Sequence, residues 1–231
     1  MDIGRISNAE NADVFLVFAT VDKSLGYKGI TCFIVKRDTP GLTVGPAEDK
    51  IGLRASATCE VRLEEVYVPA SDVLGHVGEG YKIAMSTLNE GRIGIAAQMV
   101  GLAQGALDRT LPYLFTREQF GQPIGTFQSM QHRYAALSVD ITSARLLMYN
   151  AARKQEQGLD VMQDASMAKY HAGIVAERTA SACIELAGAV GITPAFGVEK
   201  YYRDAKVATI YEGTAHMQLN TIAKAMQREF Q

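Results

Sequence analysis

The pattern of apolar and polar positions changes its period near residue 75. Before that point, short runs rich in β-branched residues alternate with turn formers, and after it apolar residues recur every three to four positions. A period of two is typical of strands, and a period of 3.6 is typical of helices. The pattern therefore predicts a β domain over 1–75 and a helical domain over 76–231.

Strand signals fill the first half of the chain. Two apolar runs joined by a Gly-containing connection predict a β-hairpin. The clearest alternation places Cys59, Val61 and Leu63 on one face, with polar residues between them. Such alternation is typical of an antiparallel sheet with one solvated face. The runs expected to form strands are 14–19, 29–35, 42–44, 58–64 and 66–68.

Helical signals fill the second half. Pro112 is expected to kink the first helix or to mark its last turns, because proline lacks a donor and clashes with the preceding turn. Gly158 is expected to stop the second helix. Helices are expected at about 80–115, 127–157, 162–187, 198–208 and 214–228. The predicted fold class is α+β, with a partial antiparallel β domain followed by an all-α four-helix bundle.

Composition and charge narrow the function classes. The chain has 231 residues, with 23 Lys+Arg against 25 Asp+Glu and a formal net charge of −2. This balance gives no electrostatic footprint for nucleic acid or an anionic membrane. Three scattered cysteines favour a reducing compartment. With no run near the roughly 20 apolar residues of a spanning helix and no apolar signal core, a soluble intracellular protein is expected.

Glu212 is the leading candidate for chemistry. It follows an apolar run and precedes Gly213, and Thr214 can cap the next helix. A carboxylate in such a place is partly desolvated, and burial raises the pKa of a carboxyl group, which suits a general base. A glutamate that only stabilises the helix N-terminus through the helix dipole explains the same pattern.

Two further segments can bind an anionic group. Arg117 can bind a phosphate through two hydrogen bonds, and Gln128 can pair with a nucleobase or a phosphate. An arginine at a helix C-terminus is also common for electrostatic reasons alone. The glycines within 188–191 can let the backbone approach a diphosphate, or can simply end a helix. The sequence has neither metal-ligand spacing of His and Cys nor a Gly-x-Ser-x-Gly motif. No metal site and no serine hydrolase are therefore expected.

Five segments of distinctive sequence occur in one order along the chain, and they are 26–30, 53–56, 88–92, 117–121 and 202–214. Their combination closely resembles the acyl-CoA dehydrogenase family. The sequence around 89–98 and 150–153 is most similar to the short/branched-chain members of that family.

The resemblance implies FAD-dependent oxidation of a short or branched-chain acyl-CoA thioester to the trans-2-enoyl-CoA. Glu212 matches the base that removes the α-proton while the β-hydrogen leaves as hydride to flavin N5. In the family, the backbone N–H of this glutamate and a flavin ribityl hydroxyl polarise the thioester carbonyl, which a preorganised donor pair can do. Some relatives carry the base on the first bundle helix, where this chain has Gly91.

The resemblance also implies which residues of this chain contact the cofactor and the substrate. Cofactor contacts are implied for Arg117, Gln128, Glu185, Leu186, Ala187, Gly188, Ala189, Thr214, Ala215 and His216. Acyl-CoA contacts are implied for Tyr27, Tyr81, Asn89, Glu90, Gly91 and Arg92. In the family, the residues matching Arg117 and Gln128 hold the diphosphate and adenine side of the FAD of a neighbouring subunit.

The resemblance also implies partners and a cellular setting. It implies a homo-oligomer, usually a dimer of dimers, that is reoxidised by an electron-transferring flavoprotein. The reaction belongs to fatty-acid or branched-chain amino-acid degradation. The compartment is the bacterial cytoplasm or the mitochondrial matrix.

The chain departs from the family pattern in places. Ala189 stands where a second glycine is usual, and Arg5 stands where a flavin-packing tryptophan is expected in a chain that has no Trp. Family subunits have an N-terminal helical domain and a complete β domain, whereas this chain begins partway through the β domain. A fragment of a longer product and a shortened relative with an incomplete flavin site both remain open. The competing functions are an inactive oligomerising bundle and an acyl-CoA oxidase.

Overall fold

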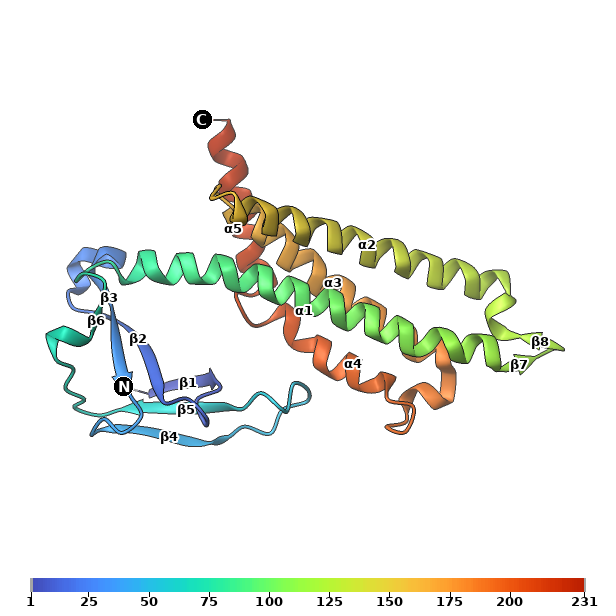
Figure 1. Cartoon of the computed structure of the whole chain (residues 1–231), viewed down its shortest axis with the longest axis horizontal. Helices are drawn as coiled ribbons and strands as arrows, with labels where there is room; N and C mark the ends of the chain where they lie inside the picture. Colours follow the sequence, from blue (N-terminus) through green and yellow to red (C-terminus); the bar gives the residue numbers. More distant parts are fainter. Residues whose placement is uncertain (1, 231) are drawn as a thin grey trace. The chain divides into compact units, whose positions relative to one another are not determined.

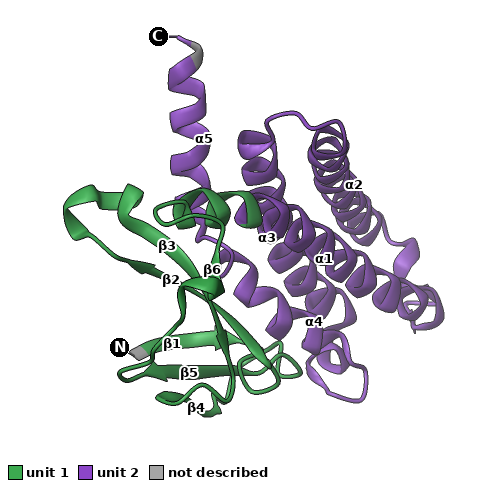
Figure 2. Ribbon diagram, turned by 60° about the vertical axis from the view of Figure 1, so that its left-hand side comes forward, with its two compact units in different colours: residues 1–87 green, residues 88–231 purple. Residues whose placement is uncertain are grey.

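The structure, a computed structural model, describes residues 2–230 (Figure 1). Two compact units divide the chain, residues 1–87 and residues 88–231 (Figure 2). The domain boundary predicted after residue 75 stays a prediction.

Strands of the first unit form two antiparallel sheets. In one sheet the order is β1–β5–β4, and in the other it is β2–β3–β6. The strand bounds are β1 Asp2–Ser7, β2 Val14–Thr20, β3 Ile30–Lys36, β4 Leu42–Ala47, β5 Thr58–Leu63 and β6 Val73–Leu74.

The predicted hairpin is confirmed, because β2 pairs with β3 in antiparallel register with Val17 opposite Phe33. Cys59 and Val61 of β5 are buried as the alternation predicted, and Leu63 is half-buried. Their side chains belong to one apolar cluster with residues of β2 and β3, so the core of this unit unites the two sheets.

The structure corrects the expected strands of the first unit at three places, residues 66–68, strand β1 and strand β6, which pairs with β3 and was not expected. The segment 66–68 is not a strand, although Val66 and Val68 pack against the apolar cluster while Tyr67 is 81% exposed. Its alternation therefore reflects packing without a hydrogen-bonded ladder. Strand β1 was not expected, and it exists because it pairs with β5, more than 50 residues away.

Helices follow from residue 80 onward. Their bounds are α1 Gly80–Thr116, α2 Gln128–Glu156, α3 Met162–Ala187, α4 Val198–Ala205 and α5 Ala215–Glu229. Pro112 lies in the last turns of α1, and Gly158 has φ +71° just beyond α2, where it stops that helix. Helix α4 is shorter than expected because residues 206–209 tighten into a 3₁₀ turn.

Small side chains on α3 build the core of the second unit. Ala168, Ala172 and Ala176 are buried, and they pack in one cluster with Met99 of α1 and Ile141 of α2. Figures 1 and 2 show α1, α2 and α3 side by side along this core. Alanines at helical spacing let neighbouring helices approach closely, as the sequence pattern predicted.

A matched pair of glycine substitutions in α1 tests the packing of the first unit. A Cβ on Gly80 would lie 2.6 Å from the carbonyl carbon of Thr31 and 2.8 Å from the nitrogen of Cys32, whereas a Cβ on Gly94 meets nothing within 4 Å. We expect Gly80→Ala to lower the free energy of unfolding by about 1–3 kcal/mol through overpacking. Gly94→Ala should leave it unchanged or raise it by up to about 1 kcal/mol. Urea unfolding measures both, and equal midpoints would contradict the close approach at residue 80.

Candidate functional site

Glu212 lies in a sharp turn that leads into α5. Its φ is +52° and that of Gly213 is +86°, so two consecutive residues adopt left-handed backbone. Thr214 is the N-cap of α5, and its Oγ1 accepts a hydrogen bond from the Met217 backbone N–H at 3.3 Å. The glutamate side chain is half-buried. The expectation that Glu212 precedes a capped helix is met, and the turn fixes where its carboxylate points.

The carboxylate of Glu212 lies directly against Gly91 of α1. A Cβ built on Gly91 would be 2.7 Å from Glu212 Oε2 and 3.4 Å from its Cδ. Real Cβ atoms essentially never approach an oxygen so closely, so any larger residue at position 91 must displace the carboxylate. The structure thus brings together two of the positions that the sequence singled out.

Two buried cations accompany this carboxylate. Arg92 is 8% exposed and Lys169 is 1% exposed. The Nη1 of Arg92 donates to Asn89 Oδ1 at 3.0 Å and lies 3.5 Å from Ser166 Oγ. Burial lowers the pKa of the Arg92 guanidinium, and the charge of Glu212 acts against that shift. Burial is also the largest influence on Lys169, whose pKa falls to about 8 although Glu212 raises it.

Backbone carbonyls of the turn are held by two side chains that we call the carbonyl clamp, Lys169 of α3 and Gln218 of α5. Lys169 Nζ donates to the carbonyl oxygen of Gly213 at 2.7 Å. Gln218 Nε2 donates to the carbonyl oxygens of Glu212 and Gly213 at 2.9 and 3.0 Å. Gln218 is fully buried. The clamp therefore holds the two peptide groups on either side of Gly213, directly after the glutamate.

Tyr211 completes the cluster beside Glu212. Its hydroxyl donates to Gln98 Oε1 at 2.9 Å, and its ring centroid lies 5.9 Å from Lys169 Nζ. Burial raises the pKa of Tyr211 to about 12, with a further contribution from the charge of Glu212. The phenol therefore stays neutral at physiological pH and acts as a hydrogen-bond donor.

Sequence reasoning missed Lys169 and Gln218. One signal was present for the lysine, because position 169 is four residues after Ala165 and three before Ala172, on the buried alanine face of α3. A lysine in that register is almost never buried without a partner. No comparable pattern marks Gln218.

The other residues expected to contact acyl-CoA belong to both units. In the first unit, Tyr27 and Tyr81 are exposed, and their ring centroids lie 5.2 Å apart at an interplanar angle of 48°. In the second unit, Asn89 is half-buried beside Arg92, and Glu90 is exposed with its Oε1 3.4 Å from Gln155 Nε2.

The residues expected to contact the cofactor form two groups within the second unit. Thr214, Ala215 and His216 form the start of α5, next to Glu212. The others lie near the far ends of α1 and α3: Arg117, Gln128, Glu185, Leu186, Ala187, Gly188 and Ala189. In this second group Glu185 forms an ion pair with Arg133 of α2, and Leu186 and Ala187 are buried.

An exposed hairpin joins α1 to α2 beside Arg117. Its strands are β7 (Glu118–Gln119) and β8 (Gln122–Pro123). The turn between them holds Phe120, which is 92% exposed and has φ +53°. Arg117 and Gln128 are both exposed at the base of this hairpin, where their donors are available to a ligand.

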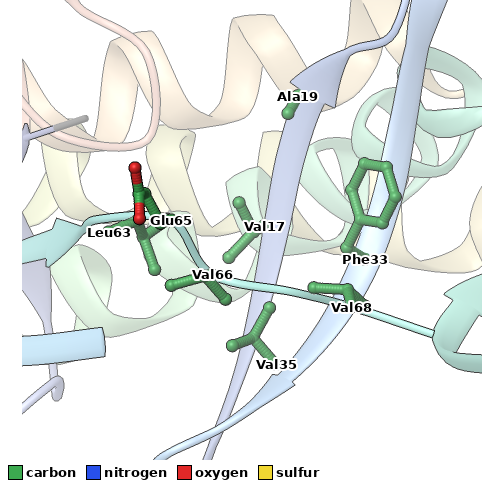
Figure 3. Close-up of a pocket in the computed structure, with 8 residues that line it drawn as sticks. All are labelled: Val17, Ala19, Phe33, Val35, Leu63, Glu65, Val66 and Val68. Atoms are coloured by element: carbon green, nitrogen blue, oxygen red, sulfur yellow. The ribbon is translucent and has the colours of Figure 1, made fainter. Parts of the chain in front are cut away.

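A groove of about 460 Å³ in the first unit offers different chemistry (Figure 3). Seven of its eight lining side chains are apolar, among them Val17, Phe33 and Val68, and Glu65 is its one titratable group. A groove without convergent polar groups has no acid–base machinery. This groove therefore does not compete with the cluster around Glu212 as a site for acid–base chemistry.

Residues 2–230 contain no group of three or more His, Cys, Asp or Glu placed to hold a metal ion. In the same residues, none of the helices is long and apolar enough to span a membrane.

Comparison with known proteins gives matches over both units. Sequence models described as acyl-CoA dehydrogenase, middle domain, and acyl-CoA dehydrogenase, C-terminal domain, match residues 5–66 and 78–227. The probable short/branched chain specific acyl-CoA dehydrogenase of Dictyostelium discoideum is 59% identical over 225 residues, covering 97% of this chain and 54% of that protein. The chain thus spans about half the length of this curated relative.

Solved structures share the fold. Butyryl-CoA dehydrogenase from Megasphaera elsdenii has a TM-score of 0.96 and 42% identity, over 98% of this chain and 59% of that one. An FAD-dependent dehydrogenase has a TM-score of 0.96 and 30% identity, over 98% of this chain and 61% of that one. With the observed sheets and helices, these similarities confirm the predicted α+β fold class.

The lowered pKa of Lys169 predicts a pH-dependent stability. The folded chain releases this proton near pH 8, whereas the unfolded chain holds it up to the ordinary value of 10.5. Between those values the unfolded state binds more protons, so the free energy of unfolding rises with pH. Below about pH 8 both states are protonated, and the contribution is constant.

We therefore compare the free energy of unfolding of the wild type with that of Lys169→Met at each pH. The difference, wild type minus variant, should rise between about pH 8 and 9.5 by at most about 1 kcal/mol per pH unit. Urea unfolding across this range measures the difference, in which the titrations common to both proteins cancel. Lys206→Met is the control, because the carboxylate of Glu177 raises the pKa of Lys206 and moves its window above pH 10.5. A flat difference for Lys169→Met would show that this amine titrates normally.

Proposed function

The chain belongs to the acyl-CoA dehydrogenase family, and on that premise we propose that Glu212 is the catalytic base. The substrate is a short or branched-chain acyl-CoA thioester, and the product is its trans-2-enoyl-CoA. The short or branched acyl group of the substrate is supported by the 59% identity of this protein to a relative named as specific for short/branched chains. The observation that carries the assignment is the Glu212 carboxylate lying against Gly91 beside two buried cations.

Acid–base chemistry at this carboxylate follows from its surroundings. The C–H bond next to a thioester is weakly acidic, so the base must be held within hydrogen-bond reach of the α-proton. A Glu212 oxygen accepts that proton, and the electron pair of the C–H bond forms the new double bond. A base on the first bundle helix would have to come from position 91, which is a glycine. The side chain of Glu212 fills the space that such a residue would occupy.

FAD is the cofactor that family membership indicates. When bound, it accepts the β-hydrogen with its two electrons. The residues present suit it, because Arg117, Gln128 and the exposed first turn of α5 all supply hydrogen-bond donors. A dinucleotide offers phosphate and ring acceptors to such donors, and a helix N-terminus favours electron-rich groups.

The two groups of cofactor positions cannot serve one FAD molecule within one chain. From Gly91, next to Glu212, helix α1 continues for 25 residues to Thr116, just before Arg117, which at 1.5 Å per residue is about 38 Å. That exceeds the reach of a single dinucleotide. We therefore assign Thr214–His216 to the cofactor of the same chain and Arg117, Gln128 and 185–189 to that of a neighbouring copy. This division supports a homo-oligomer.

Substrate contacts are proposed at both units. In the first, the paired rings of Tyr27 and Tyr81 offer an exposed aromatic surface. In the second, Gly91 lies against the carboxylate, Arg92 interacts with it electrostatically and binds Asn89, and Glu90 is exposed on the same turn. An electron-transferring flavoprotein is the proposed electron acceptor.

Glu212→Gln tests the proposal in the purified protein that carries this chain. The amide keeps the size of the side chain but does not accept a proton as a carboxylate does. We expect turnover of a branched short-chain acyl-CoA to fall by roughly 10²–10⁴-fold with FAD still bound. Substrate-dependent bleaching of the flavin absorbance and reduction of a dye acceptor measure this. Glu156→Gln, at an exposed carboxylate ending α2, should keep wild-type turnover.

The same assay separates the competing functions. Turnover retained by Glu212→Gln would contradict the assignment of Glu212 as the base. A wild type without stoichiometric flavin absorbance would favour the inactive bundle. Substrate-dependent peroxide production in air, with no dye reduction under anaerobic conditions, would identify an oxidase instead.

A further inference from the structure

We propose that Lys169 is a positioning residue that holds the Glu212 carboxylate in its reacting position through the carbonyl oxygen of Gly213. This inference rests on the proposed function of Glu212. Lys169 does not touch the reacting atoms itself. Its Nζ reaches across from α3 and ends 2.7 Å from the backbone of the turn.

The geometry makes the turn depend on this contact. Glu212 has φ +52°, a backbone conformation that costs a non-glycine residue of order 1–3 kcal/mol unless its surroundings impose it. The carbonyl clamp supplies that constraint from two helices, since Lys169 belongs to α3 and Gln218 to α5. The carbonyl oxygen of Gly213 accepts from both residues. Removing either donor frees one side of the turn.

Lysine suits this position better than a neutral residue does. A charged donor forms a stronger hydrogen bond to a carbonyl than a neutral one, and its charge also attracts the carboxylate one residue away. The charged and titratable groups facing Lys169 are Arg92 from α1 together with Glu212 and Tyr211 from the turn. Gln218 faces the same carbonyl from α5 without a charge. Glu212 is thus the one negative partner in this set.

Activity measurements provide the first test. In the protein that carries this chain, Lys169→Met should lower kcat and kcat/KM by a similar factor of about 10–100 per bound FAD, because a displaced base affects the chemical step. KM should stay near the wild-type value, because Lys169 does not touch the reacting atoms. Lys169→Arg, which retains the charge and the donors, should restore part of kcat. A merely structural lysine would lower the yield of folded protein without changing kcat per bound FAD.

Hydrogen exchange provides a readout independent of turnover. The amides of Tyr211 and Gln218 bond to Val207 and Thr214 on either side of the turn. Their exchange in Lys169→Met should accelerate about tenfold or more while amides in the middle of α2 stay protected. Lys206→Met is the matched control, because Lys206 is a half-exposed lysine six residues before Glu212 whose ion pair with Glu177 leaves the turn untouched. Its kcat and exchange should match the wild type.

The outcomes separate this inference from the proposed function. Unchanged kcat and unchanged exchange in Lys169→Met would overturn the positioning role. Uniformly faster exchange across α2 would also overturn it, since that result shows general destabilisation. Faster exchange at the turn alone, in a protein whose wild type has no turnover with any acyl-CoA, would leave the clamp intact and refute the proposed function.

Discussion

Burial of charge is the constraint on which the candidate site depends. Lys169 and Arg92 are nearly inaccessible to solvent, and a buried charge is tolerated only where it is paired and hydrogen-bonded. Their partners include the Glu212 carboxylate and the Gly213 carbonyl, which both belong to the turn before α5. The position of that turn is therefore coupled to the electrostatics of α1 and α3, and the connection is part of the core rather than a passive loop.

The turn and the cations stabilise one another. A left-handed non-glycine residue is unfavourable by itself, whereas hydrogen bonds to charged donors are worth about 1.5–3 kcal/mol each. The bond from Lys169 is thus large enough to offset the backbone strain at Glu212. In return, the turn gives the lysine an acceptor that α3, with its own carbonyls used in the helix, does not offer. Strain at a chemically active residue is expected where function needs a fixed direction.

Much of the fold could be predicted from sequence because local preference and packing agree. The bounds of α3 match the expected 162–187, since its alanine face has both the helical period and a place in the core. Expectations failed where the two disagree. Residues 66–68 alternate without pairing, and α4 ends early when the chain tightens toward the turn. Strand β1 depends on a partner strand far along the chain, which its own residues do not reveal.

The candidate site could also be predicted from the sequence only in part. Glu212 could be singled out because a carboxylate before a helix cap is a local pattern, and Gly91 could be named by resemblance. Their contact is a property of the folded chain, because it depends on how α1 passes the turn. Lys169 shows the limit most clearly. Its place on a buried face was readable, but its acceptor is a backbone carbonyl, and every residue has one. The partner of a buried cation is therefore invisible in sequence whenever that partner is the backbone.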